Sequence, residues 1–108
     1  MSVREEVNKF VEKINSNPVH IQDEKDRVFQ IDLDESELFQ IVIEGGKISI
    51  ADGEKHDANV TLRTSEKNFL KLLKDDLNTT MAFMTGGLKV DGNLGLALKL
   101  QEIVKKYQ

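Results

Sequence analysis

The stretch LFQIVIEGGKISI, residues 38–50, alternates apolar and polar side chains on either side of two adjacent glycines. A period of two residues is typical of a strand that buries one of its faces. Gly45-Gly46 favours a two-residue hairpin turn, because both central positions of a type I′ turn need a positive φ angle. The stretch therefore predicts two antiparallel strands, at Leu38–Glu44 and from about Ile48 to Asp52. The side chains expected on their apolar face are Phe39, Ile41, Ile43, Ile48 and Ile50.

Three further segments extend this pattern toward a larger sheet. Arg27–Leu33 alternates in the same way and precedes the hairpin as the first strand of a meander. Ala58–Arg63 predicts a fourth strand, with Val60 and Leu62 inward. Leu88–Val90 predicts a short fifth strand.

The remaining segments have the spacing of helices. Residues 3–14 carry one apolar stripe, and Ser2 precedes Glu5 at the spacing of a capping box. Asn17-Pro18 is expected to end this helix, because proline lacks an amide donor and restricts the residue before it. Three more helices are predicted: at Glu66–Asp75, at a short segment that contains Met81–Met84 and is capped by Asn78, and at Leu94–Tyr107.

Length and composition set the class of protein. The chain has 108 residues and no cysteine, and its 15 basic and 19 acidic residues give a net charge of −4. One domain over residues 1–108 is expected, with a sheet of about five strands covered by helices on one face, a two-layer sandwich. The charge argues against nucleic acid and against anionic membranes as partners. The charged start and the lack of a long apolar run predict a cytoplasmic protein without stable membrane insertion.

The last third of the chain has more apolar surface than one buried helix face can use. Apolar residues surround most of the helix predicted at Leu94–Tyr107, so that helix must bury more than one face. The second face could meet Met81–Met84, a second copy of the chain in a weak homodimer, or an apolar ligand. Met81–Met84 itself could fill an ordinary gap in the core or form a pliable wall of a lipid-sized cavity, because methionine adapts to irregular contacts.

Several short motifs in this region resemble a known family. Ser65–Leu70, Leu77-Asn78, Ala82–Gly86, Leu88–Val90 and Gly92–Gln101 are similar, in order and in spacing, to the sterol carrier protein 2 domain. The resemblance implies an α+β fold, a mostly antiparallel mixed sheet of five strands with helices packed on one face. It also implies an apolar tunnel between sheet and helices that binds a sterol, fatty acid, fatty acyl-CoA or phospholipid. The chain would then be a non-enzymatic lipid carrier that needs no cofactor.

The resemblance also assigns candidate lipid-binding residues by their position. Gln101 falls where the family has a glutamine on its final helix, where it could bind a ligand hydroxyl or carboxylate or simply face the solvent. Lys71, Lys74, Lys89 and Lys99 could attract a carboxylate or phosphate, although solvated surface lysines are the more common case. The residues expected to line the tunnel are Phe69, Leu73, Leu77, Met81, Phe83, Met84, Leu88, Leu96, Leu100 and Ile103.

Nothing in the sequence supports catalysis or metal binding. His20 and His56 lie in polar, turn-like stretches far apart in the chain and are expected to be exposed loop residues. No nucleophile elbow, dinucleotide loop or EF-hand spacing occurs. The alternative to a lipid carrier is therefore an interaction module, whose apolar groove takes a partner helix or a second copy of the chain.

Overall fold

The computed structural model describes residues 2–34 and 36–108. Its elements follow one another as α1 (Val3–Ser16), a 3₁₀ turn η1 (Pro18–His20), β1 (Arg27–Leu33), β2 (Glu37–Glu44), β3 (Lys47–Asp52), β4 (Val60–Thr64), α2 (Glu66–Leu73), α3 (Thr79–Met84), β5 (Leu88–Gly92) and α4 (Leu94–Lys106). Each strand and helix predicted from the sequence is present, with ends that differ by about two residues.

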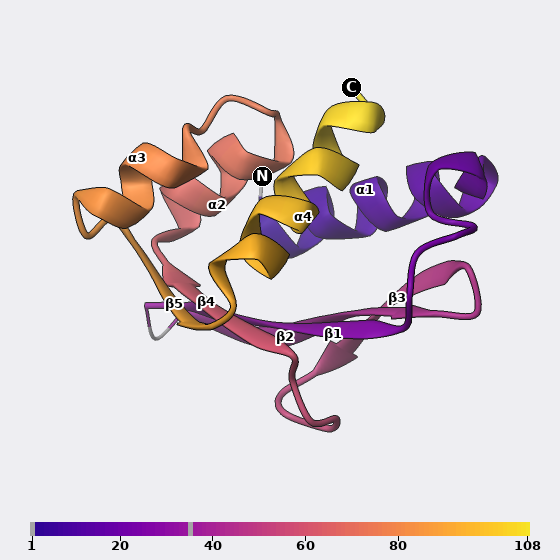
Figure 1. Ribbon diagram of the computed structural model, residues 1–108, viewed down its shortest axis with the longest axis horizontal. Coiled ribbons are helices and arrows are strands. Elements are labelled where there is room, and N and C mark those ends of the chain that lie inside the picture. Colours follow the sequence, from indigo (N-terminus) through magenta and orange to yellow (C-terminus); the bar gives the residue numbers. More distant parts are fainter. Residues whose placement is uncertain (1, 35) are drawn as a thin grey trace.

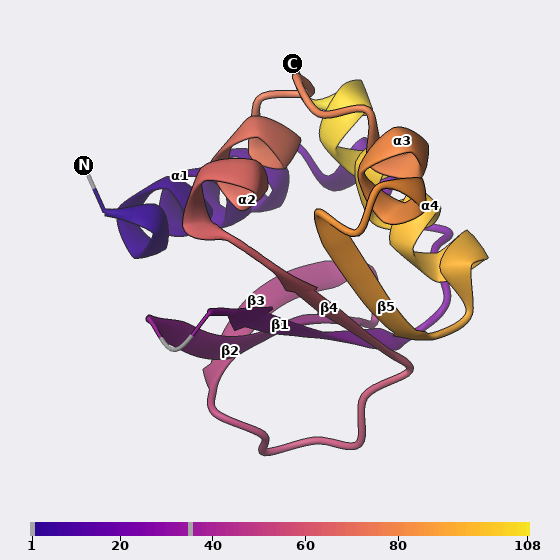
Figure 2. The ribbon, with the colours of Figure 1, turned by 90° about the vertical axis from the view of Figure 1, so that its left-hand side faces the viewer.

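The five strands form one mixed sheet in the order β3-β2-β1-β4-β5. β1 and β4 run parallel, and the other neighbouring pairs are antiparallel. Gly45 and Gly46 form the predicted hairpin turn with φ angles of 60° and 75°. The four α-helices all cover the same face of the sheet (Figure 1), and Figure 2 shows the two layers from the side. The predicted α+β two-layer sandwich is confirmed.

Helix α1 is an ordinary amphipathic helix. The Ser2 hydroxyl accepts a hydrogen bond from the Glu5 amide at 3.1 Å, which satisfies one of the free donors at the helix start. The helix ends at Ser16, just before the proline. Its buried stripe lies in the common core and consists of Val3, Val7, Phe10 and Ile14. Packing of this stripe, rather than local propensity, therefore holds the helix in place.

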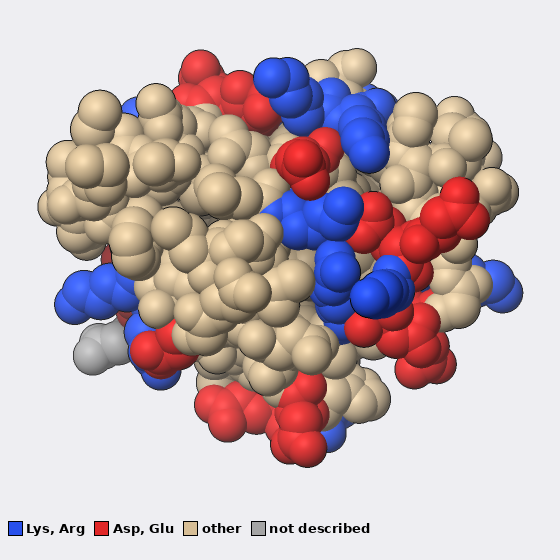
Figure 3. All heavy atoms as spheres, in the orientation of Figure 1, with Lys and Arg blue, Asp and Glu red and all other residues tan. Residues whose placement is uncertain are grey.

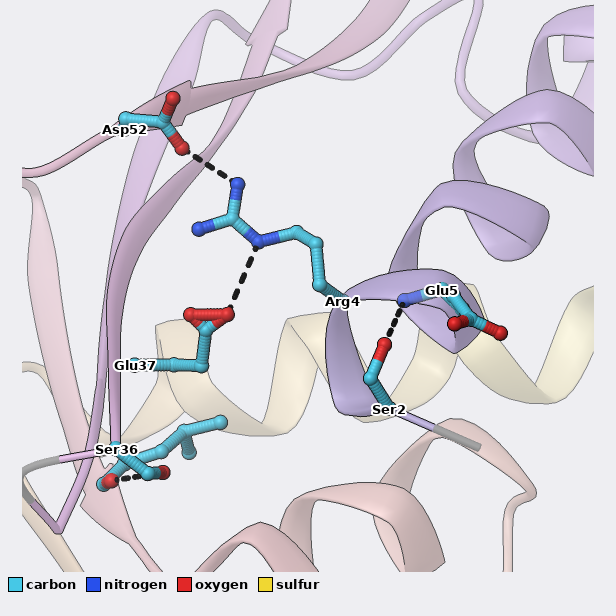
Figure 4. A network of polar contacts seen from close by, with 7 residues as sticks. Ser2, Arg4, Glu5, Ser36, Glu37 and Asp52 are labelled. Atoms are coloured by element: carbon cyan, nitrogen blue, oxygen red, sulfur yellow. Dashed lines mark hydrogen bonds and ion pairs between the residues drawn. The ribbon is translucent and has the colours of Figure 1, made fainter.

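Arg4 ties the start of α1 to the sheet. Its guanidinium Nη1 lies 2.5 Å from a carboxylate oxygen of Asp52 on β3, and its Nε lies 3.6 Å from Glu37 on β2 (Figure 4). The same guanidinium stacks over the ring of Phe39, 4.9 Å from its centre. α1 is thus fixed to the sheet by charge as well as by its apolar stripe.

The second face of the sheet is partly covered by the loop at residues 53–59, which folds beneath the sheet in Figure 1. Gln40, which has no exposed surface, donates to the His56 carbonyl at 2.7 Å and accepts from the His56 amide at 3.0 Å. It also donates to Gln30 at 2.8 Å, and Gln30 donates to the Gly53 carbonyl at 3.1 Å. Two glutamines predicted on a polar, open face are therefore buried and fully bonded beneath a loop.

Candidate functional site

The predicted lining residues fall into two groups in the structure. Five of them are buried in the common core beneath the C-terminal helices: Phe69, Leu73, Leu88, Leu100 and Ile103. A side chain that lined a void wide enough for water would keep accessible surface, yet Phe69 and Leu100 keep 0%. The helices therefore lie directly on the sheet at these two residues, and this part of the site is closed.

The second group is exposed on α3. Met81, Phe83 and Met84 keep 55%, 39% and 74% of their surface exposed. The same helix buries Thr79 to 1% and half-buries Ala82, which lies one turn further along. α3 thus packs on the molecule through Thr79, Ala82 and the covered part of Phe83, and turns Met81 and Met84 outward. This is the reverse of an ordinary amphipathic helix.

Thr79 is a candidate site residue that the sequence analysis missed. Its hydroxyl oxygen is buried and has no hydrogen-bond partner among the residues that the structure describes. Leaving a buried hydroxyl unpaired costs about 1–3 kcal/mol. Thr79 is the first residue of α3, where no preceding helical turn offers a carbonyl to its hydroxyl. Because Thr79 and Thr80 are adjacent and identical, the sequence does not indicate which of the two hydroxyls faces the core.

The polar residues that were predicted to contact a ligand are Gln101 and four lysines, and they lie in different surroundings. Gln101 is half-buried, and its amide donates to the Leu77 carbonyl at 3.0 Å, which ties α4 to the loop before α3. Lys99 is engaged with Glu24 at 3.1 Å and with Glu102 at 3.7 Å. The other three lysines, Lys71, Lys74 and Lys89, are exposed. Leu77 and Leu96 are partly buried at the edge of the core.

Small clefts reach two of the predicted residues. Leu73 lines a cleft of about 160 Å³ between α1 and α2, together with Phe10, Leu70 and Tyr107. Gln101 lines a shallow cleft of about 290 Å³ on the outer side of α4. The first cleft is bordered by α1, α2 and the C-terminal end of the chain, and the second by residues of α4 alone, so neither is lined by a strand of the sheet.

The two histidines lie on opposite sides of the sheet. His20 lies beside the ring of Tyr107 on the helical side, whereas His56 belongs to the loop beneath the sheet, and both are exposed as predicted. Among the residues described, no three histidine, cysteine or carboxylate side chains are grouped to hold a metal ion. None of the helices described is both long and apolar enough to cross a membrane.

The sequence agrees with a known family over most of its length. A sequence model of the SCP-2 sterol transfer family matches residues 7–105. The chain belongs to this family. Among curated relatives, Hydroxysteroid dehydrogenase-like protein 2 of Xenopus tropicalis is 35% identical over 77 residues, which is 70% of this chain and 18% of that protein. Sterol carrier protein 2 of Homo sapiens is 36% identical over 61 residues, 56% of this chain and 11% of that protein.

The chain therefore spans less than a fifth of the length of these curated relatives. Solved structures agree with the fold over nearly the whole chain. Palmitated SCP2L2 from Aedes aegypti has a TM-score of 0.71 at 20% identity, covering 96% of this chain and 95% of that one. Sterol carrier protein domain 2 of Helicoverpa armigera has a TM-score of 0.69 at 21% identity, covering 93% and 83%. The sequence-based recognition of the family is confirmed.

Proposed function

We propose that this protein binds an apolar lipid between the inner side of α3 and the buried side chains beneath it, and carries that lipid without changing it chemically. The observation that carries the proposal is the arrangement of α3, which exposes its large apolar residues and buries an unpaired hydroxyl. Both features are costly in the closed protein. The hydroxyl would gain a partner if α3 moved aside and a lipid entered beneath it, and the exposed side chains would then border the opening.

The contacts of α3 support such a movement. The helix has six residues and packs mainly on β5 and α4. A helix this short has little stability of its own and depends on these contacts. Opening it exposes less core than opening α1 would, because its inward residues are Thr79 and Ala82 rather than a stripe of large side chains.

In this proposal the predicted lining residues have different roles in binding the lipid. The five buried side chains form the floor of the site, and Leu77 and Leu96 form its edge. Met81, Phe83 and Met84 lie along the opening through which the lipid passes. The Thr79 hydroxyl, which is buried on the inner side of α3, bonds the polar group of the lipid, and Gln101 keeps the loop before α3 in place.

The driving force is the transfer of hydrocarbon out of water. Each buried methylene contributes about 0.8 kcal/mol. A fatty chain of roughly 14–16 carbons would gain on the order of 10 kcal/mol, against which the costs of immobilising the chain and of moving α3 must be set. Family membership supports a lipid ligand, and the palmitated neighbour from Aedes aegypti makes palmitate a reasonable first probe.

Binding can be measured directly with the full chain. The purified protein is extracted with organic solvent, and the extract is searched for lipids by mass spectrometry. The delipidated protein is then titrated with palmitate and with a fluorescent sterol below their micellar concentrations. We expect at least one of these lipids to bind with micromolar or tighter affinity and to raise the melting temperature by mass action. A protein that yields no lipid and binds neither probe would contradict the proposal.

Thr79→Val and Thr80→Val form a matched pair for locating the site. Thr79 is buried and unpaired, whereas its neighbour Thr80 is exposed. Thr79→Val should raise the stability of the empty protein by about 1 kcal/mol, because it removes a buried unpaired hydroxyl. It should also weaken palmitate binding by about fivefold through loss of one hydrogen bond. Thr80→Val should do neither, and equal affinities for both variants would remove Thr79 from the site.

A further inference from the structure

The outer side of α3 carries a cluster of exposed apolar side chains. Met81, Phe83 and Met84 lie within four residues of one another on this helix. The other large apolar side chains that are exposed in the described part of the chain stand singly: Val19 in η1 and Leu38 on β2. Scattered exposed apolar residues are normal, but a cluster on one short helix marks a contact surface.

This surface is also uncharged. The sequence from Leu77 to Leu88 contains no lysine, arginine, aspartate or glutamate, and neither does the stretch from Gly92 to Leu98 at the start of α4. Figure 3 shows the result as a wide uncharged area over α3, at the upper left, that continues toward the start of α4. A contact partner of this surface therefore has to be neutral where it touches the protein.

We propose that the outer side of α3 docks on the surface of a neutral, zwitterionic bilayer, and that the lipid enters and leaves the protein there. This inference rests on the proposed function, because it places the exchange of that lipid at the same helix. A surface that selects anionic membranes presents clustered lysine and arginine side chains. The exposed cluster has none, and the net charge of −4 opposes docking on anionic lipid.

A second copy of the chain fits this surface less well. Stable protein complexes bury about 800 Å² on each partner. Even an aromatic side chain buries only about 150–250 Å² in full, and Met81, Phe83 and Met84 are already partly covered. The cluster is therefore too small to hold a dimer, but it is large enough to enter the interfacial region of a bilayer, where apolar side chains are buried without further partners.

The docking is expected to be brief. A single myristoyl chain gives only marginal, reversible membrane binding, and three partly exposed side chains bury less apolar surface than that. Reversible contact suits a carrier, which has to leave the membrane after each exchange.

The test uses the full, delipidated chain and extruded phosphatidylcholine vesicles at millimolar lipid, with the bound fraction measured by sedimentation. A second set of vesicles contains added phosphatidylserine, and both sets are measured at low and high NaCl. We expect binding to phosphatidylcholine alone, with no increase on adding phosphatidylserine and no loss in salt. Met84→Glu should lower the bound fraction by roughly fivefold or more, because it places a charge in the cluster.

Val19→Glu is the matched control, since Val19 is 52% exposed but lies away from α3. It should bind vesicles as the unchanged protein does. Equal losses in both variants, binding that needs phosphatidylserine, or no binding to phosphatidylcholine would overturn the proposal. So would a dimer, seen without vesicles by analytical ultracentrifugation, that Met84→Glu dissociates. Palmitate titration without vesicles separates the two proposals: a protein that binds palmitate but not vesicles keeps its proposed function and loses this docking site.

Discussion

Helix α1 buries Val7 and Ile14 completely and leaves most of its charged residues exposed, whereas α3 exposes Met81 and Met84 and buries a threonine. Both helices lie on the same side of the same sheet. α1 contacts β3 and α2, and its first turn is tied to two strands by Arg4. α3 contacts β5 and α4 and contains no charged residue.

The difference distinguishes a helix whose packing stabilises the whole fold from a short helix that contributes less to the core. Removing α1 from the sheet would expose a continuous apolar stripe, so α1 should open only with the whole molecule. Removing α3 would expose less new apolar surface on the helix itself, because Met81 and Met84 are already more than half exposed. Local stability is therefore expected to be high at α1 and low at α3.

The largest effect should come from shortening a side chain of α1. Ile14→Ala deletes methyl groups from a fully buried site and should lower the free energy of unfolding by about 2–5 kcal/mol. Met84→Ala, on α3, removes a side chain that is mostly exposed and should change it by less than about 0.5 kcal/mol. Urea unfolding followed by circular dichroism measures both. Similar losses in the two variants would mean that α3 is packed as firmly as α1.

A smaller effect is expected from removing the N-terminal cap of each helix. The Ser2 hydroxyl accepts from Glu5 at 3.1 Å, and the Asn78 side chain accepts from the Met81 amide at 3.0 Å. Loss of such a cap costs about 1 kcal/mol. Ser2→Ala should lower the global stability by this amount, because α1 unfolds with the molecule.

Asn78→Ala should act locally instead. Hydrogen exchange at the α3 amides is expected to speed up by about fivefold, the equivalent of about 1 kcal/mol, while the urea midpoint barely moves. Native-state exchange measured by nuclear magnetic resonance reports the α3 rates, and urea unfolding of the same variant gives the midpoint. If Asn78→Ala lowers the urea midpoint as much as Ser2→Ala does, α3 belongs to the global unfolding unit and the contrast between the helices fails.

The sequence was sufficient to predict the helices and strands and their arrangement in two layers. Alternation at residues 38–50 and the two glycines determine a hairpin locally, so short-range reasoning finds them. The position of β4 beside β1, in parallel, depends on contacts far apart in the chain, and the family resemblance implied only that the sheet is mixed. The burial of Gln40 depends on how the loop at residues 53–59 folds back, which no local pattern records.

The arrangement of the candidate site could not be predicted from the sequence in the same way. An apolar run as short as Met81–Met84 surrounds most of a helix, so its sequence does not tell which side faces the sheet. The residues on one side of α3 are Thr79 and Ala82, and only the packing on β5 and α4 selects them as the inner side. The prediction that these methionines and Phe83 line a lipid site remains to be tested by binding measurements.

The smallest expected effect concerns the ion pair between Arg4 of α1 and Asp52 of β3. The hydrogen bond from Arg4, together with its positive charge, lowers the pKa of Asp52 below its usual 3.8 (Figure 4). A carboxylate with a lowered pKa stabilises the folded state above the unfolded pKa, and this contribution is lost as the pH falls through the folded value. The unchanged protein should therefore be slightly more stable than Asp52→Asn at neutral pH. This difference should shrink below about pH 3.8.

Asp57→Asn serves as the control, because Asp57 is exposed and forms no ion pair among the residues described. Its unfolding midpoint should follow that of the unchanged protein at every pH. Because Asp52 is exposed, salt should weaken the difference for Asp52→Asn as well. α3 has no titratable residue, so the exchange rates of its amides, corrected for intrinsic chemistry, should not respond to Asp52→Asn at any pH. A response there would show that the two helices are coupled through the sheet, and that α3 does not open independently of α1.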